Sequence, residues 1–317
     1  MRHVLVTGGA GFIGSNLIDK LLQQNDTFVT SLDNFGGVHS RLFKEHNISR
    51  FINFNNYRFI EGDICSSNDL EKIKNVSIII HLAGKAGVRN SFDNEGSYYN
   101  NNVVGTENLL EYAKRNHIKQ FIYASSSSVY GLNQHMPWNE EEELLPTSPY
   151  AKTKMYGEHL GRAYSARFGI RFISLRLFSV YGPAQRTDLV ISQFVNRISN
   201  QLPIFVYGDG SSKRDYTHVE DIVNGMMAAV DYKQSLYEEI NLASNRAIEL
   251  KYVIGLIEIL CRKQAVVHYC PEQAGDLYVT CGDISKAARL LNYKPTVSLK
   301  DGLAKYYDWY MGNYKNT

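Results

Sequence analysis

Thr7-Gly8-Gly9-Ala10-Gly11-Phe12-Ile13-Gly14 is the stretch that decides the fold. A short apolar run over His3–Thr7 precedes it and predicts a buried parallel strand. Helical spacing of apolar residues follows over Phe12–Gln24. Gly8, Gly11 and Gly14 would provide a tight turn, close approach of the backbone to a pyrophosphate and close packing of the helix. The N-terminus of the helix would then face the phosphates. The stretch predicts a dinucleotide site; its alternative is a glycine turn with a structural role alone.

A second strand is predicted over Phe28–Asp33 and ends in a carboxylate. Asp33 stands about twenty positions beyond the glycines, where an acidic side chain suits hydrogen bonds to the ribose hydroxyls of NAD and repels a 2′-phosphate. Asp63-Ile64, after a third strand, is a candidate for contact with adenine. The predicted cofactor contacts from these segments are Gly8, Gly11, Phe12, Ile13, Gly14, Asp33, Asn34, Asp63, Ile64, Leu82, Ala83 and Gly84.

The fourth predicted strand ends at His81-Leu82-Ala83-Gly84. Its small residues fall where the backbone must pass close to a cofactor. His81 itself is interpreted as a packed or hydrogen-bonded structural histidine rather than a catalyst.

Composition excludes several classes of protein. The chain has 317 residues, of which 44% are hydrophobic and 21% charged, values typical of a globular protein. A net charge of +2 and the lack of any Lys/Arg block argue against nucleic-acid binding. No apolar run is long enough to cross a membrane, and no signal sequence is evident, so a cytoplasmic location is expected. The four cysteines lack CxxC spacing, so neither a metal site nor disulfides are expected.

Strands and helices alternate through the first half of the chain. Further strands are predicted over 57–60, 77–82, 120–124 and 171–175, and long helices over Glu95–Asn116 and Ser148–Phe168. This alternation predicts an α/β fold, a doubly wound parallel Rossmann sheet with a smaller C-terminal α+β substrate-binding lobe. Residues 1–178 would form the NAD-binding domain, with 218–242 returning to it, and 179–217 and 243–317 the interwoven lobe.

Tyr150 and Lys154 lie four residues apart on a predicted helix and so share a face. A free tyrosine has a pKa of about 10 and is a poor base at neutral pH. A neighbouring ammonium favours the phenolate and lowers that pKa. The pair is a plausible general acid and base, although this spacing alone is common.

A serine-rich turn, Ser125-Ser126-Ser127-Ser128, follows the strand at 120–124. The carboxyl ends of parallel strands border the ligand crevice of such folds. A serine hydroxyl there could hydrogen-bond the substrate oxygen that Tyr150 deprotonates. The alternative is a turn whose hydroxyls are satisfied by local backbone bonds.

These motifs together resemble the extended short-chain dehydrogenase/reductase family, specifically its nucleotide-sugar epimerases and dehydratases. The resemblance spans nearly the whole chain. It implies catalytic roles for Ser126, Tyr150 and Lys154, contact of Asn102, Tyr150 and Lys154 with NAD, and a supporting hydrogen bond from Asn102. The motifs are TGGAGFIG (7–14), HLAG (81–84), YYNNNVVGT (98–106), SSSSVYG (125–131), YAKTK (150–154), VYGDGSSKRDYTHVED (206–221) and GDISKA (282–287).

The residues after Ser126 discriminate among reactions in this family. Dehydratases that the chain resembles carry an Asp-Glu pair there, and uronate decarboxylases a Glu just before the Val-Tyr. This chain has Ser127 and Ser128, whose hydroxyls cannot replace a carboxylic acid in proton transfer. The resemblance therefore implies 4-epimerisation: oxidation to a 4-keto sugar, then reduction on the opposite face, with NAD regenerated.

Three segments, 86–91, 128–133 and 178–186, are similar to UDP-glucuronate 4-epimerases. Arg89 and Arg186 are forked donors suited to a carboxylate or phosphate, and Ser179 could donate to a C-6 carboxylate. Either arginine could instead serve only the diphosphate or a surface ion pair. The predicted substrate contacts are Arg89, Ser126, Ser128, Phe178, Ser179, Arg186, Gln193, Val206 and Arg214.

Two departures from the family pattern stand out. Many relatives carry an arginine shortly after a Gly-Asp like Gly275-Asp276, whereas this chain has Leu277-Tyr278-Val279. This weakens the expected grip of that segment on the diphosphate. Thr187 also stands where the uronate epimerases usually have proline.

Other functions remain open at this point. A UDP-glucose or UDP-N-acetylhexosamine 4-epimerase would differ in the width of the pocket, and a UDP-glucuronate decarboxylase in release of carbon dioxide. A non-catalytic NAD-binding sensor would share the fold. The expected partner is a UDP-sugar, with no nucleic acid and no membrane, and the family implies a homodimer through helices 95–116 and 148–168.

Overall fold

The computed structural model describes residues 2–37, 40–272 and 277–314. Its centre is a parallel sheet in the order β3-β2-β1-β4-β5-β6-β10. The order reverses between β1 and β4, the place where doubly wound folds bind their ligands. The strands are β1 (Arg2–Thr7), β2 (Thr27–Asp33), β3 (Tyr57–Glu61), β4 (Ile78–His81), β5 (Gln120–Ser126), β6 (Arg171–Leu177) and β10 (Tyr237–Leu242).

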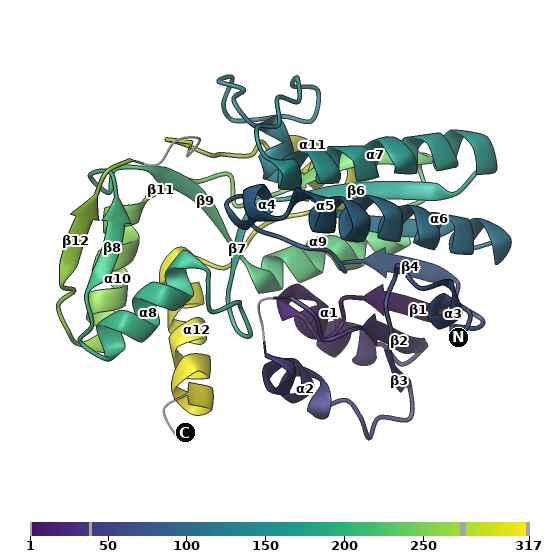
Figure 1. The fold of residues 1–317 in the computed structure, drawn as a ribbon, viewed down its shortest axis with the longest axis horizontal. Coiled ribbons are helices and arrows are strands. Elements are labelled where there is room, and N and C mark those ends of the chain that lie inside the picture. The colour runs from purple at the N-terminus through teal and green to yellow at the C-terminus, as the bar shows by residue number, and fades with distance from the viewer. Residues whose placement is uncertain (1, 38–39, 273–276, 315–317) are drawn as a thin grey trace.

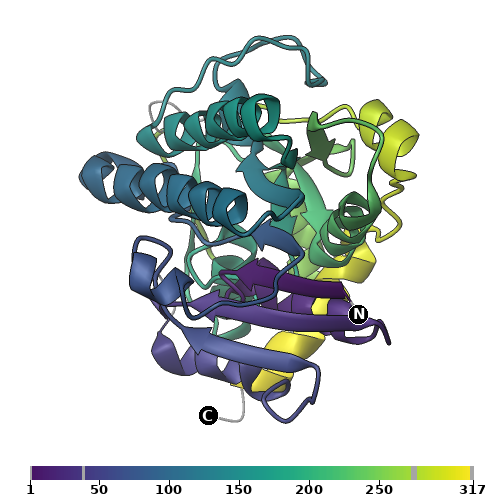
Figure 2. The ribbon, with the colours of Figure 1, turned by 90° about the vertical axis from the view of Figure 1, so that its right-hand side faces the viewer.

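Helices cover both faces of the sheet. On one face α6 (Gly105–Arg115) and α7 (Pro149–Phe168) run side by side, and on the other α1 (Phe12–Leu22) packs against α9 (Val219–Asp231) (Figures 1 and 2). Successive residues of β1 enter opposite cores: Val4 and Val6 join the α1/α9 side, and Leu5 the α6 side. Both faces are therefore apolar, as a parallel sheet requires. Shorter helices complete the layers: α2 (Arg41–Ser49), α3 (Ser67–Leu70), α4 (Asn90–Asp93), η2 (Ser127–Tyr130) and α11 (Ser285–Leu291).

The smaller lobe lies at one end of the molecule (Figure 1). A three-stranded sheet, β11-β9-β7, and a two-stranded sheet, β12-β8, share a core with three helices. The predicted fold class is thereby confirmed. The elements are β7 (Ser179–Tyr181), α8 (Val190–Ser199), β8 (Ile204–Tyr207), β9 (Lys213–His218), β11 (Ala247–Glu249), α10 (Leu250–Cys261), β12 (Val267–Cys270) and α12 (Leu299–Tyr314).

The chain passes between the two parts more than once. After β9 it enters α9 and then β10, which pairs with β6 at the edge of the large sheet. It then returns to the lobe at β11. The expected domain boundaries at 178, 218 and 242 stay a prediction. Among the described residues, no helix is both long and apolar enough to span a bilayer.

One predicted helix is present but is not α-helical throughout. A single helix was expected over Glu95–Asn116, but α5 (Glu95–Tyr99) is followed by a π-helical turn, η1 (Asn100–Val104), before α6 begins. The wider turn lets the buried side chain of Asn102 leave the helix and bond elsewhere. Its amide nitrogen donates to the Lys85 carbonyl at 2.9 Å and to the Thr153 hydroxyl at 3.0 Å. Such turns are often found at functional sites.

Candidate active site

The glycine turn between β1 and α1 has no room for side chains at Gly8 and Gly14. Gly8 has a φ of +72°, and a side chain there would meet the backbone of Ala83 at 2.7 Å. A Cβ on Gly14 would come within 2.2 Å of the Gly8 carbonyl oxygen. Gly11 is the N-cap of α1, and no side chain bonds the helix terminus. Its positive end is therefore open to the phosphates of a dinucleotide, and the predicted residues Phe12, Ile13 and Gly14 form its first turn.

Asp33 stands at the end of β2, beside this turn. Its carboxylate accepts hydrogen bonds from the backbone of Ala10 at 3.2 Å and of Phe35 at 2.9 Å. It also pairs with the buried ammonium of Lys44 at 2.9 Å. The carboxylate suits ribose hydroxyls, as the sequence predicts, but the neighbouring lysine reduces its repulsion of a 2′-phosphate. The residues present fit NAD.

The other predicted cofactor contacts follow the carboxyl ends of β2, β3 and β4. Asn34 donates to Asp63 at 2.9 Å, so the ends of β2 and β3 are joined by side chains. Ile64 is buried against Gly105, the first residue of α6. Ala83 hydrogen-bonds Thr7 at the end of β1. Gly84 has Asn102 and the Lys154 ammonium within 3.3 Å of its Cβ position, so its lack of a side chain leaves room at this point.

Tyr150 and Ser126 come together from different elements. Tyr150 lies in the first turn of α7, which Ser148 caps through the Ala151 amide. Ser126 ends β5 and accepts hydrogen bonds from the backbone of Ser128 at 3.2 Å and from its hydroxyl at 2.9 Å. Burial raises the pKa of Tyr150, whereas a hydrogen bond with Ser126 and the charge of Arg186 act to lower it. Burial has the larger effect, and Ser126 and Arg186 are the groups that favour the phenolate against it.

Lys154 lies one turn further along α7 and is buried. Its ammonium donates to the Ala124 carbonyl at 2.8 Å and lies 4.9 Å from the centre of the Tyr123 ring. Burial lowers the pKa of Lys154 to about 8, against the opposing charge of Glu158. The side chain therefore still carries most of its charge at neutral pH.

His81 is structural, as predicted. Its ring nitrogens bond the hydroxyls of Thr7 at 2.7 Å and Thr106 at 3.0 Å. Burial, followed by the nearby charge of Lys154, lowers the pKa of His81 to about 3. A histidine that stays neutral and has both nitrogens engaged is not available for proton transfer.

The predicted sugar contacts are described in two groups, of which the first comprises Arg186, Ser179 and Arg89. Its guanidinium grips Asp188 through two bonds, Nε at 2.9 Å and Nη2 at 2.5 Å, and donates to the Ala86 carbonyl. Against the effect of burial, the charge of Arg186 acts to lower the pKa of Tyr150. Ser179 begins β7 opposite Tyr216. Arg89, at the start of α4, lies over the ring of Tyr207 at 4.9 Å.

In the second group, two residues are buried and two donate hydrogen bonds to neighbouring carbonyls. Phe178 and Val206 are buried in the core, so any contact with a ligand would come from their backbone atoms. Gln193 is exposed and donates to the Asp188 carbonyl. Arg214 donates to the carbonyls of Lys213 and Tyr278. Tyr278 belongs to the segment that departs from the family pattern, whereas Gly275-Asp276 lies outside the described residues.

Sequence reasoning missed two charged partners, Lys44 beside Asp33 and Asp188 beside Arg186. Lys44 lies eleven positions beyond its partner on a helix of mixed polarity, a pattern typical of a solvated lysine. Asp188 could have been found, because an Arg-x-Asp spacing allows a local ion pair.

Comparison with known proteins agrees with this geometry. The family described as the NAD dependent epimerase/dehydratase family matches residues 4–243. A UDP-glucuronate 4-epimerase of Thermodesulfobacterium geofontis is 37% identical over 314 residues, which cover 98% of this chain and 96% of that protein.

Solved structures are similar over almost the whole chain. A crystal structure of UDP-glucuronic acid 4-epimerase from Bacillus cereus, in complex with UDP-glucuronic acid and NAD, has a TM-score of 0.92 at 36% identity and covers 99% of this chain and 100% of that one. A UDP-N-acetylglucosamine 4-epimerase from Methanobrevibacter ruminantium M1, in complex with UDP-N-acetylmuramic acid, has a TM-score of 0.91 at 30% identity and covers 98% of each chain.

Proposed function

The chain belongs to the NAD dependent epimerase/dehydratase family, and from this premise we propose that it is a UDP-sugar 4-epimerase that converts UDP-glucuronate to UDP-galacturonate. One observation carries the reaction class. Tyr150 interacts with Ser126, and the residues that follow Ser126 in its turn carry hydroxyls and not carboxylates. Such a site can exchange a proton with one sugar hydroxyl but lacks, within that turn, the acids that dehydration requires.

In the proposed mechanism the phenolate of Tyr150 takes the proton from the 4-hydroxyl of the sugar. Ser126 hydrogen-bonds the same oxygen and keeps it in line. Lys154 stabilises the phenolate by its charge. NAD, when bound, supplies the acceptor for the hydride of C4 and returns it. After the 4-keto sugar has rotated to present its other face, Tyr150 gives the proton back to the newly formed alkoxide.

The choice of a uronate rests on the relatives and on local chemistry. The relatives above include two proteins named for UDP-glucuronate or UDP-glucuronic acid. Ser179 and the hydroxyl turn offer neutral donors to a carboxylate, and Arg186 adds a cation whose charge Asp188 partly offsets. Donors that stabilise the carboxylate would also oppose its loss as carbon dioxide from the 4-keto sugar. A neutral hexose or N-acetylhexosamine is the second candidate, favoured by the likeness to a UDP-N-acetylglucosamine 4-epimerase.

The test is direct. Purified protein is incubated separately with UDP-glucuronate, UDP-glucose and UDP-N-acetylglucosamine, and the products are resolved by chromatography. We expect UDP-galacturonate from the first, without stoichiometric NADH and without carbon dioxide. Conversion of the neutral sugars alone would overturn the uronate assignment, and stoichiometric NADH would overturn simple epimerisation.

We also propose a homodimer formed through the α5–η1–α6 segment and α7. These helices lie side by side, and Tyr99 and Tyr156 leave large apolar surface exposed on them. We propose a cytoplasmic location as well, because all four cysteines are free thiols.

A further inference from the structure

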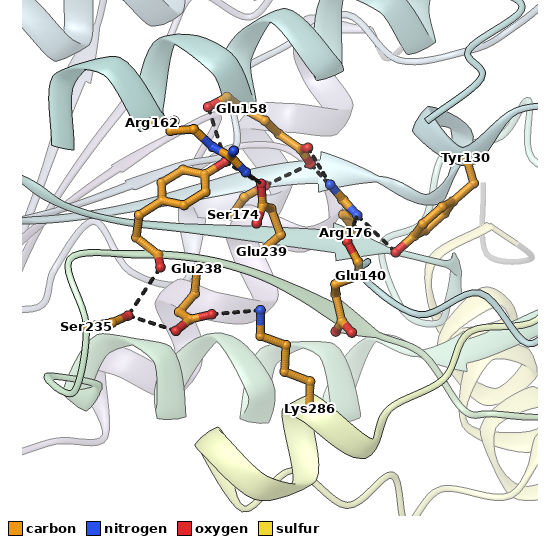
Figure 3. Close-up of polar contacts among 11 residues, drawn as sticks. Tyr130, Glu140, Glu158, Arg162, Ser174, Arg176, Ser235, Glu238, Glu239 and Lys286 are labelled. Atoms are coloured by element: carbon orange, nitrogen blue, oxygen red, sulfur yellow. Dashed lines mark hydrogen bonds and ion pairs between the residues drawn. The ribbon is translucent and has the colours of Figure 1, made fainter. Parts of the chain in front are cut away.

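A buried ion pair lies directly behind the proposed catalytic residues. Arg176 of β6 grips Glu158 of α7 through two bonds, Nε to Oε1 at 3.0 Å and Nη2 to Oε2 at 2.8 Å (Figure 3). Ser174 donates to the same carboxylate at 3.0 Å. The two charged side chains are 3% and 1% exposed. Burying two charges costs solvation that their attraction repays poorly, so fold stability alone is a weak reason for this pair.

The pair joins the two elements that carry the proposed chemistry. Glu158 lies one turn beyond Lys154 and two turns beyond Tyr150 on α7. Arg176 is the sheet partner of Ser125, the residue before Ser126. Its Nη1 also donates to the Tyr130 hydroxyl at 3.1 Å, and Tyr130 ends the η2 turn that begins after Ser126. A continuous chain of bonds thus runs from α7 to the serine turn.

The far end of this chain is anchored as well. The Tyr130 hydroxyl donates to the Asn241 side chain at 2.7 Å, and the Asn241 backbone donates to Glu140 at 2.7 Å. Asn241 belongs to β10, the last strand of the sheet. The serine turn is therefore held from behind by side chains, and not by backbone bonds alone.

The pair also shapes the charge around Lys154. The titratable groups that interact with its ammonium are Glu158 from α7, Tyr123 from β5 and His81 from β4. Tyr150 lies one turn away on the same face of α7. His81 is neutral, so Glu158 supplies the negative charge of this set. Its field keeps the pKa of Lys154 from falling further under burial. Because Arg176 holds both carboxylate oxygens, Glu158 acts on Lys154 through its field while the ammonium stays on the Ala124 carbonyl.

We propose that Glu158 and Arg176 are positioning residues for the epimerisation, a role that rests on the proposed function: the pair keeps Lys154 charged and holds the serine turn in place against Tyr150. Neither residue would touch the substrate. The pair is distinct from the Arg162–Glu239 pair, which joins the next turn of α7 to β10 at 2.7 Å but has an exposed arginine.

The test replaces the whole pair with apolar groups, because removing one partner would strand a buried charge and unfold the chain. In Glu158→Leu/Arg176→Met we expect kcat to fall by about tenfold or more while KM changes less than about threefold. In the wild type, kcat should rise with pH only until Lys154 begins to lose its proton, because the active state has Tyr150 as phenolate and Lys154 as ammonium. That turning point moves to lower pH in the variant, since Lys154 loses its proton earlier. Arg162→Met/Glu239→Gln is the matched control and keeps both the rate and the profile.

A direct titration separates this proposal from the proposed function. In protein carrying ¹³C-labelled lysine, with the Lys154 signal assigned through Lys154→Arg, the pKa of Lys154 is read by NMR with NAD present. We expect a lower pKa in the pair-replaced variant and an unchanged one in the control. If the wild-type protein epimerises no UDP-sugar, the proposed function fails, and the titration still decides whether the pair sets the charge of Lys154.

A second variant serves where the replacement does not fold. Arg176→Lys keeps the buried charge but loses the forked grip on Glu158 and the bond to Tyr130. It should lower kcat without moving the pH at which kcat stops rising, since the charges near Lys154 are retained. A folded pair-replaced variant with wild-type rate and profile would overturn the proposal. So would an Arg176→Lys variant with wild-type kcat.

Discussion

Among individual residues, Tyr150 and Lys154 respond to burial in opposite directions. Burial raises the pKa of the phenol and lowers that of the ammonium to about 8, so each change favours a neutral group. The phenolate–ammonium state needed for proton exchange therefore depends on neighbours that oppose burial. Ser126 and Arg186 do this for Tyr150, and Glu158 does it for Lys154.

Replacing Tyr150 by phenylalanine removes the proton carrier and little else. We expect Tyr150→Phe to lower kcat by about 10²–10⁴-fold, the usual contribution of general acid–base catalysis. NAD released on denaturation should match that of the wild type. Tyr98→Phe, which alters the neighbouring ring contacting Tyr150 edge-on, is the control and should keep most activity. Equal losses in both variants would count against a specific role for Tyr150.

The rate should also depend on pH through Lys154. The active state has Tyr150 as phenolate and Lys154 as ammonium, so kcat should rise with pH while the pair loses its first proton. It should stop rising above about pH 8, where Lys154 loses its own proton instead. Rates measured at saturating substrate from about pH 6 to 10 would show this levelling. Lys154→Arg stays charged over that range and should show no such levelling in whatever activity it retains. A wild-type kcat that climbs steadily to the top of the range would contradict this assignment.

At the level of elements, the glycine turn and α1 form the most constrained part of the cofactor site. Gly14→Ala would place a methyl group 2.2 Å from the Gly8 carbonyl oxygen. We expect a loss of about 1–3 kcal/mol in stability and of most NAD binding, because the helix must move away from the turn. Thermal melts and fluorescence titration with NADH measure the two effects. Gly96→Ala is the control, since nothing lies within 4 Å of its Cβ position.

Local pattern was enough to predict some elements and not others. The strands from β1 to β6 were predictable because buried parallel strands are short apolar runs, and the glycine turn because its spacing is specific. The π-helical turn at Asn100–Val104 was not, because its residues have the polarity of an ordinary helix and only the tertiary bonds of Asn102 reveal it. The same holds for Glu158 and Arg176, eighteen positions apart, whose pairing depends on how α7 packs on β6.

At the scale of the whole molecule, the exposed apolar residues on α7 and α5 bear on assembly. If the proposed dimer forms there, Tyr156→Asp should convert it to a monomer by burying a charge without a partner. Sedimentation velocity measures the change. Tyr252→Asp, at a more exposed site on α10 of the lobe, should leave the assembly intact. A wild-type protein that sediments as a monomer, or a Tyr252→Asp variant that dissociates, would refute this interface.

The path of the chain also governs how the protein is made. β10 is the last strand of the large sheet and pairs with β6, and its residue Asn241 accepts a hydrogen bond from the Tyr130 hydroxyl. Both β10 and Asn241 come later in the chain than the first segments of the lobe. On a ribosome, the N-terminal part would emerge with its last strand still unsynthesised and β6 as an open edge. The nascent chain cannot complete either the sheet or the support of the serine turn until Leu242 has left the exit tunnel. During that interval it is a natural client for chaperones that shield unpaired strands.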